Sequence, residues 1–373
     1  MSVPPFIDWV HVFQRHNTVR AEGGDVTDAP FPVVASGVRI TDVWDREGPV
    51  ESFLGLVHEG SHSSKVWLRS DGSNVELSGN PGRFGRPDNV FNLGWEETLD
   101  VSNRLLAARG LPAFSAGEVK VKDSVSAHDA QRGLFEEWTG ARVSELHVTK
   151  NYFTGSPEVA REVIRFWASQ SKARLRKGRL GDETVVFGSG ASTHQVECYI
   201  KAPEMLAHAK GEDAKRAMQE SELYQWCHDT GLVRIEVKAK RGYLRNRGMN
   251  FLGGVNMDKV INLFDKATGF LLDARPDQLA RVADQLPRKL RKYALLWLSG
   301  YDLQLAYSRA TVFRIAKELR EYGLDITTPR KVAGAENAVQ ELDKLLSKLP
   351  SFELVEAAAP SWYCAESEWG KAA

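Results

Sequence analysis

Residues with catalytic side chains alternate with apolar residues in four short segments of the sequence. The polar positions are Asn74, Glu76 and Ser78; Glu145, His147 and Thr149; Gln195, Glu197, Tyr199 and Lys201; and Arg234, Glu236, Lys238 and Lys240. In a β-strand, side chains at i, i+2 and i+4 share one face. If the four strands pair in one sheet, we expect a common surface carrying Glu76, His147, Tyr199, Lys201 and Glu236.

These side chains suit the cleavage of a phosphodiester by transesterification. A tyrosine such as Tyr199 can be the nucleophile, although phenol is weakly ionised because its free pKa is about 10. A divalent cation held by Glu and His side chains can polarise the phosphate and position it for in-line attack. Lys201, two residues further on, can stabilise developing negative charge. The product would be a phosphotyrosine link and a free 3′-hydroxyl that a polymerase can extend.

Each of these residues also has a simpler interpretation when it is taken alone. A lone tyrosine in a strand usually packs with its hydroxyl hydrated, and a lone histidine is more often structural than a metal ligand. Glu76 and Glu236 alone would be surface carboxylates, and Lys201 a solvated charge. Tyr152, just beyond the strand of His147, is interpreted as a packing residue rather than a second nucleophile.

The composition predicts a two-domain globular protein of a reducing cytoplasm. The chain has 373 residues, and domains usually have about 100–200. Its three cysteines, Cys198, Cys227 and Cys364, are far apart, which predicts neither a disulfide framework nor a zinc site. We find no apolar run of the roughly 18 residues needed to cross a bilayer, and no export signal at the start of the sequence.

The distribution of charge indicates a polyanionic partner although the net charge is zero. Basic residues cluster within 161–179, 234–247 and 288–292. Local patches of this kind neutralise phosphates without making the whole protein basic. Solvated faces of helices and strands are the alternative interpretation of each cluster. The residues expected to bind DNA here are Arg174, Arg176, Lys177, Arg234 and Lys238.

The pattern along the chain predicts an α+β fold in two parts. An antiparallel-sheet catalytic domain with helices on one face is expected over residues 1–255, and a mostly helical DNA-binding or accessory domain over 256–373. Helices are expected over 95–109, 156–171 and 203–228, and the alanine-rich tail after Glu356 is expected to be frayed. The first 65 residues look rich in strands and turns but receive no role.

Four motifs within residues 70–250 resemble, in order and spacing, the gene II/gene X replication-initiation family of filamentous phages and related plasmids. The first is Asn74-Val75-Glu76-Leu77-Ser78, followed by Asp88-Asn89-Val90-Phe91. The second is Val143-Ser144-Glu145-Leu146-His147-Val148-Thr149 and the helix after it. The third is Thr184-Val185-Val186-Phe187, a Gly-Ser turn and Cys198-Tyr199-Ile200-Lys201. The fourth is Gly231-Leu232-Val233-Arg234-Ile235-Glu236-Val237-Lys238 with Tyr243-Leu244.

The resemblance implies a rolling-circle nickase of the HUH endonuclease class. It places Tyr199 on the covalent nucleophile and Lys201 on the lysine that follows it. The class uses Mg²⁺ or Mn²⁺, and its broad pattern has two histidines where this chain has His147-Val148-Thr149. Glu76 and His147 are therefore the expected ligands, with Thr149, Glu236 or His194 as a third. Expected partners are origin DNA, single-stranded at the nick and duplex at its flanks, and host helicase, polymerase and single-strand-binding protein, with no membrane.

The C-terminal part contains a candidate helix-turn-helix unit. Two helical patterns within 295–326 are joined by Gly300-Tyr301-Asp302, and the second resembles a recognition helix with Arg309 and Arg314 near its start. An ordinary helical hairpin is the alternative. Such a unit would hold duplex DNA while the first domain acts on exposed single strand.

Three other functions remain open from the sequence. A non-catalytic phage or plasmid DNA-binding regulator would form no covalent adduct. A relaxase or transposase would share the chemistry, but those enzymes usually carry further long domains. A metal-dependent nuclease that uses water would remain active without the hydroxyl of Tyr199.

Overall fold

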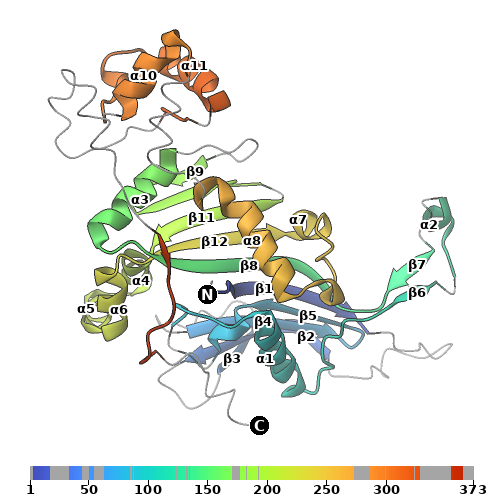
Figure 1. Cartoon of the computed structure of the whole chain (residues 1–373). Coiled ribbons are helices and arrows are strands. Elements are labelled where there is room, and N and C mark those ends of the chain that lie inside the picture. Colours follow the sequence, from blue (N-terminus) through green and yellow to red (C-terminus); the bar gives the residue numbers. More distant parts are fainter. Residues whose placement is uncertain are drawn as a thin grey trace.

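The computed structural model shows an α+β fold built around a large antiparallel sheet, as the alternating pattern predicted (Figure 1). It describes residues 3–16, 33–43, 50–53, 63–84, 86, 88–122, 124–131, 133, 135–169, 177–181, 183–191, 193–272, 286–298, 300–322, 324–327 and 354–363.

Eleven described strands form this sheet, in the order β3-β2-β4-β5-β1-β8-β12-β11-β10-β9, with β13 paired to one end of β8. Their bounds are β1 Phe6–Arg15, β2 Val33–Val43, β3 Val50–Phe53, β4 Ser63–Asp71, β5 Asn74–Gly79, β8 Arg142–Phe153, β9 Lys177–Leu180, β10 Thr184–Phe187, β11 His194–Ile200, β12 Val233–Lys240 and β13 Val355–Glu356. A separate arm pairs β6 (Val119–Val121) with β7 (Glu136–Trp138) and carries α2 (Ala127–Gln131). The four strands predicted to carry the chemistry, β5, β8, β11 and β12, all belong to the large sheet.

Three of the longer described helices pack on this sheet. α8 (Met257–Leu272) contacts β8 and β12, α3 (Pro157–Ser169) contacts β10 and β11, and α1 (Trp95–Ala107) contacts β1 and α8. Figure 1 shows α3 and α8 lying across the same face of the sheet. The apolar residues of α8 recur every three or four positions, so one side of the helix is buried. These residues are Val260, Leu263, Phe264, Ala267 and Leu271.

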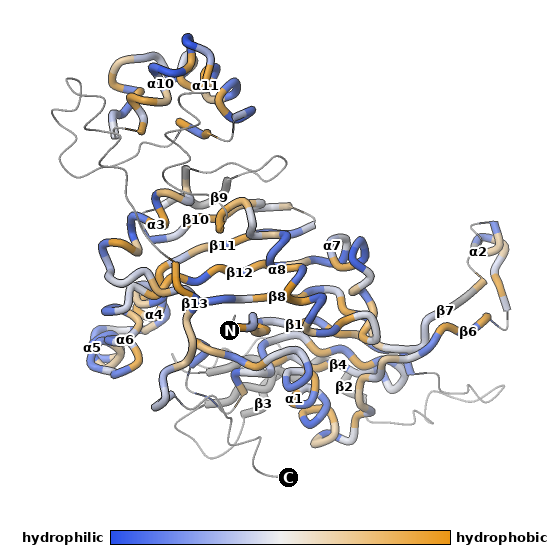
Figure 2. The backbone as a smooth tube through the Cα atoms, viewed as in Figure 1, coloured by the Kyte–Doolittle hydropathy of each residue, from blue (hydrophilic) through white to orange (hydrophobic). Residues whose placement is uncertain are grey.

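The strands present their apolar side chains to the core and their polar ones to the opposite face. In β12, Val233, Ile235 and Val237 are fully buried, and in β8 Leu146 and Val148 are as well. Apolar residues accordingly follow the central strands in Figure 2. Because the side-chain period is two, the intervening polar positions of each strand lie on the opposite face of the sheet.

The single helix expected over 203–228 is wrong. The structure has three helices there: α4 (Lys201–His208), α5 (Glu212–Glu220) and α6 (Glu222–Asp229). Gly211, directly before α5, has φ of 88°, a conformation outside the helical region, so the chain changes direction between α4 and α5. Ser221 has extended backbone, and its side chain accepts from the backbone N–H of Tyr224 to cap α6. Lys201 begins α4 rather than ending the strand.

The unassigned first 65 residues supply the strand at the centre of the sheet. β1 lies between β5 and β8, so it separates the strands of Glu76 and His147. Its register against β8 shifts twice, between Ile7 and Trp9 and between His11 and Val12. Such irregularities re-aim side chains, and Asp8 lies at the first of them.

The C-terminal region is helical. α10 (Arg288–Leu298) and α11 (Arg309–Leu319) pack on each other through η4 (Leu303–Leu305) and η5 (Arg320–Tyr322). The helix-turn-helix interpretation of this pair stays a prediction. Short helices elsewhere are η2 (Pro81–Arg83), α7 (Arg241–Arg245) and η3 (Leu252–Gly254).

The expectation of a frayed tail after Glu356 is wrong for residues 357–363. Ala357 is 2% exposed, and its backbone N–H donates to the carbonyl of Asn151 at 2.9 Å. Tyr363 packs edge-on against Phe91. Apolar and hydrogen-bonding contacts therefore fix a segment whose alanine-rich composition suggested disorder.

Candidate active site

Tyr199 and Arg234 form the centre of the site. They lie directly opposite each other on β11 and β12. Arg234 is fully buried and Tyr199 is 8% exposed, so the two side chains share a buried position on one face of the sheet, where the charge of Arg234 acts on the phenol. A cation is thus already placed beside the hydroxyl that the sequence identified as a nucleophile.

The surroundings of Tyr199 keep its hydroxyl protonated. Burial raises the pKa of Tyr199 well above its ordinary value, and the charges of Glu236, Glu204 and Asp8 act in the same direction. The positive charge of Arg234 acts against them and favours the phenolate. Ionisation of this tyrosine therefore depends on the position of one buried guanidinium.

A network of side chains and backbone carbonyls holds Arg234. Its Nη1 pairs with Asp8 Oδ2 at 3.3 Å, and its Nε donates to Asn151 Oδ1 at 2.9 Å. Its Nη2 donates to the carbonyls of Asn89 and Val90 at 2.7 and 2.6 Å. The planar guanidinium fork can satisfy several acceptors in this way, and a lysine cannot.

Lys201 joins the same network from the first turn of α4. Its side chain is 2% exposed, and Nζ pairs with Glu204 Oε2 at 2.7 Å and donates to Asn89 Oδ1 at 3.1 Å. Burial alone would raise the pKa of Glu204, but the charge of Lys201 and the hydrogen bonds from His208 and Lys201 lower it. The ammonium is therefore held beside the loop that contacts Arg234.

His147 and two carboxylates form a second cluster on the same face. His147 Nδ1 lies 2.8 Å from Glu236 Oε1, and His147 Nε2 lies 3.0 Å from Glu145 Oε1. Lys238 pairs with Glu197 at 2.6 Å and lies 3.7 Å from Glu236. These charged side chains thus form a row across β8, β12 and β11, and β11 also carries Tyr199.

This second cluster favours positive charge between its carboxylates. Burial opposes the charged forms of His147 and Glu236, but the hydrogen bonds that His147 donates to the carboxylates of Glu145 and Glu236 raise the pKa of His147. The hydrogen bond and charge of His147, with the charge of Lys238, lower the pKa of Glu236 to about 2. A bound cation would meet the same electrostatic preference.

The other expected metal ligands lie in different surroundings. Glu76 pairs with His11 Nε2 at 2.7 Å and Arg69 Nη2 at 2.9 Å, on the far side of β1 from His147. Thr149 is fully buried opposite Glu236, and no hydrogen-bond partner of its Oγ1 is found among the described residues. His194 stacks on Tyr243, with ring centroids 4.0 Å apart.

The donor types around His147 are those that bind divalent cations. Among the described residues, no group of three or more His, Cys, Asp or Glu side chains is placed so that it could hold a metal ion by itself. Mg²⁺, however, is commonly held by one or two protein carboxylates, with waters and substrate phosphates completing the shell. Glu236 and Glu145, which both contact His147, are carboxylates of this kind.

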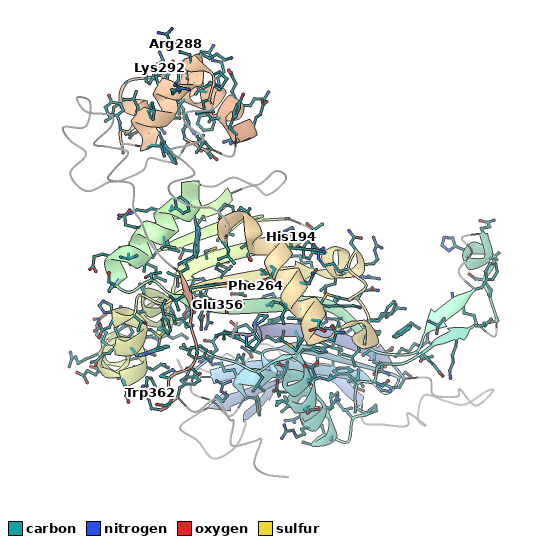
Figure 3. The ribbon with its side chains drawn as sticks, viewed as in Figure 1. His194, Phe264, Arg288, Lys292, Glu356 and Trp362 are labelled. Atoms are coloured by element: carbon teal, nitrogen blue, oxygen red, sulfur yellow. The ribbon has the colours of Figure 1, made fainter. Side chains whose placement is uncertain are left out.

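The expected DNA-binding residues fall into three groups. Arg174 and Arg176 lie outside the described residues, as does the side chain of Lys177. Arg234 is buried and Lys238 is engaged with carboxylates. Arg309 and Arg314 are exposed on α11, and the Arg309 guanidinium lies 5.5 Å from the ring centre of Phe313. Arg288 and Lys292 project from α10 at the outer end of this helical pair (Figure 3).

Comparison with known proteins decides the family. A family model described as the N-terminal part of the phage replication-associated gene II protein matches residues 6–258, and one described as its C-terminal part matches residues 283–368. This chain belongs to the family of replication-associated gene II proteins. The matched N-terminal range contains Tyr199, Arg234 and the whole His147 cluster, as the four sequence motifs predicted.

Two relatives extend over most of the chain. The replication-associated gene II protein of Escherichia phage If1 is 24% identical over 328 residues, covering 78% of this chain and 95% of the relative. The corresponding protein of Enterobacteria phage I2-2 is 25% identical over 279 residues, covering 72% and 76%. In the described part of this chain, no helix has the length and apolar character required to cross a membrane. The two family models and these two relatives identify the chain as a phage-type replication protein.

Several residues of the site were missed in the sequence. Asp8 lies at a strand irregularity, where alternation gives no signal. Asn89 lies in a loop and binds Asp8 and Lys201 through its amide group. His11 lies between Val10 and Val12, but Trp9 and Phe13 are apolar as well, so the alternation that marked the other four strands is absent here.

Proposed function

We propose that this member of the gene II family initiates rolling-circle replication by nicking one strand of a phage or plasmid origin. The observation that carries the proposal is the fully buried Arg234 directly opposite Tyr199 on the neighbouring strand, beside the His147–Glu236 cluster. A tyrosine in ordinary packing does not require a buried cation opposite it on the next strand. A nucleophile that must carry negative charge during attack does need one.

The reaction exchanges one phosphodiester for another. The phenolic oxygen of Tyr199 attacks phosphorus, the bond from phosphorus to the 3′-oxygen breaks, and a 5′-phosphotyrosine link forms. The proton lost by the phenol is balanced by the proton gained by the 3′-oxygen, so the other product is a free 3′-hydroxyl. Attack of a later 3′-hydroxyl on the phosphotyrosine reverses these steps and rejoins the displaced strand.

The other residues of the site have two roles in this proposal: to compensate negative charge and to hold the metal ion. Arg234 compensates the charge of the phenolate, while Asp8 and the carbonyls of Asn89 and Val90 fix its guanidinium. Lys201 adds positive charge next to the same loop. His147 and Glu236, with Glu145, would hold Mg²⁺ or Mn²⁺, which supplies a Lewis acid for the scissile phosphate.

The helical region would bind the duplex flank of the origin. The exposed cations Arg288 and Lys292 on α10 and Arg309 and Arg314 on α11 neutralise phosphates in this proposal. The free 3′-hydroxyl is a primer for host polymerase, and strand displacement requires a helicase and single-strand-binding protein. These partners place the reaction in the bacterial cytoplasm.

A cleavage assay tests the proposal. A labelled single-stranded origin oligonucleotide is incubated with wild type, Tyr199→Phe and Tyr224→Phe, with Mn²⁺ or with chelator, and resolved on a denaturing gel. We expect a metal-dependent covalent adduct with wild type and with the control Tyr224→Phe, and none with Tyr199→Phe. Cleavage that persists in Tyr199→Phe would indicate a nuclease using water. Tight binding without any cleavage would indicate a regulator.

A further inference from the structure

The end of the chain returns to the catalytic sheet after the helical region. Residues 354–363, here called the C-terminal arm, begin with β13, which pairs with Tyr152 and Phe153 at the end of β8 (Figure 1). The next residue, Ala357, donates its backbone N–H to the carbonyl of Asn151. The side chain of Asn151 in turn accepts from Arg234 Nε. Asn151 therefore links the arm to the guanidinium of Arg234 through hydrogen bonds.

The last described residue of the arm makes the most specific contact. The Tyr363 hydroxyl donates to Asp88 Oδ1 at 2.6 Å and accepts from Arg86 Nη2 at 2.8 Å and from the backbone N–H of Phe91 at 3.2 Å. Its ring packs edge-on against Phe91, with centroids 5.2 Å apart. One hydroxyl thus ties together both ends of the loop formed by residues 86–91.

The same loop holds the guanidinium beside the nucleophile. The carbonyls of Asn89 and Val90 both accept from Arg234 Nη2. The amide group of Asn89 connects Lys201 to Asp8. The two contacts of Tyr363 that bracket these residues, at Asp88 and Phe91, are their immediate neighbours in the chain. A shift of the loop would therefore move the acceptors of Arg234.

We propose that Tyr363 is a positioning residue for DNA nicking, which holds the 86–91 loop so that Arg234 stays aligned with Tyr199. This inference rests on the proposed function. It gives the C-terminal arm a part in the chemistry, although the arm follows the helical region and lies far from the nucleophile in sequence. Misplacing a catalytic group by about 1 Å can slow a reaction roughly a hundredfold.

The test compares three variants in the nicking assay under single-turnover conditions. Tyr363→Phe keeps the ring that packs on Phe91 but removes the hydroxyl. Asp88→Asn weakens the hydrogen bond between Tyr363 and Asp88 from the loop side. This second variant provides the test if Tyr363→Phe folds poorly. Tyr224→Phe is the matched control, since it removes a tyrosine hydroxyl from the neighbouring helix α6, outside the network. The rate at saturating oligonucleotide and the half-saturating oligonucleotide concentration are measured separately.

We expect Tyr363→Phe and Asp88→Asn each to lower the saturated rate roughly ten- to hundredfold while half-saturation stays within about twofold. The double variant should be no slower than Tyr363→Phe, because removing the Tyr363 hydroxyl already breaks the hydrogen bond that Asp88→Asn weakens. An unchanged rate, a loss confined to half-saturation, or fully additive losses would overturn the inference. Covalent adduct formation by Tyr199→Phe would instead refute the proposed function, independently of Tyr363.

Discussion

Tyr199 and Arg234 lie directly opposite each other on two adjacent antiparallel strands, and both are buried in the interior of the protein. In water, a neighbouring cation would contribute little to the ionisation of a phenol. In a buried site its interaction with a developing phenolate is much stronger, and no reorganisation is needed at the moment of attack. Four further predictions concern this pair and the groups that support it.

Replacing Arg234 should impair both the chemistry and the stability of the protein. Arg234→Gln removes the charge that favours the phenolate, so we expect adduct formation to slow at least about a hundredfold. It also leaves the buried carboxylate of Asp8 without its ion-pair partner, which should lower the free energy of unfolding by about 3–5 kcal/mol. Urea unfolding and single-turnover nicking measure the two effects. The exposed Arg241→Gln is the control, and equal behaviour of the two variants would contradict the assigned role.

Nicking should accelerate with pH throughout the range from about 6 to 9. Because burial raises the pKa of Tyr199 above its ordinary value of 10, the phenolate is a minor species over this entire range. Its fraction then increases about tenfold for each pH unit, so the logarithm of the rate at saturating metal should rise with a slope near one. A plateau reached below about pH 8 would mean that ionisation of Tyr199 does not limit the reaction.

Metal binding should depend on Glu236 more than on Glu76. Glu236 touches His147, whereas Glu76 is engaged by His11 and Arg69 across β1. We therefore expect Glu236→Gln to raise the Mn²⁺ concentration for half-maximal nicking at least about tenfold, and Glu76→Gln to raise it less. Titration of nicking against Mn²⁺ compares the two variants at equal protein concentration. A larger effect of Glu76→Gln would restore the ligand pair that the sequence suggested.

The sequence predicted those parts of the site that depend on strand periodicity. Alternation in β8, β11 and β12 brought His147, Tyr199 and Glu236 to one face, because each side chain is fixed by its own strand. Alternation could not show which strand lies between two others. β1 comes from residues to which no role was given, and it separates Glu76 from His147.

Long-range contacts explain what else was missed. Arg234 was assigned to a basic cluster expected to bind DNA and to neutralise developing charge, but the sequence could not show that it is buried. Its partners Asp8, Asn89 and Asn151 come from a strand irregularity, a loop and another strand, and only the folded chain brings them together. The tail after Glu356 was expected to be frayed because it is rich in alanine, and the sequence could not show that Asp88, a partner of Tyr363, lies 275 residues earlier in the chain.

The pair of Lys150 and Glu356 should make the C-terminal arm important for stability. Lys150 points to the helical side of the sheet, where its Nζ lies 5.9 Å from the ring centre of Phe264 and 2.6 Å from Glu356 Oε1. Figure 3 shows Glu356 reaching from the arm towards Phe264. The Lys150 side chain is 7% exposed, so removing the charge of Glu356 leaves an ammonium that water cannot fully solvate.

Glu356→Gln should therefore lower the free energy of unfolding by about 1–3 kcal/mol, measured by urea denaturation. Adding Lys150→Met should recover much of this loss, because the double variant buries no uncompensated charge. The exposed pair of Lys289 and Glu318, whose Nζ and Oε2 also lie 2.6 Å apart, is the matched control. Glu318→Gln should change stability little, because solvent screens both of its charges. If Lys150→Met failed to relieve the effect of Glu356→Gln, the ion pair would not be the source of the loss, and other contacts of Glu356 would be responsible, such as the backbone N–H of Val3 that donates to its other carboxylate oxygen.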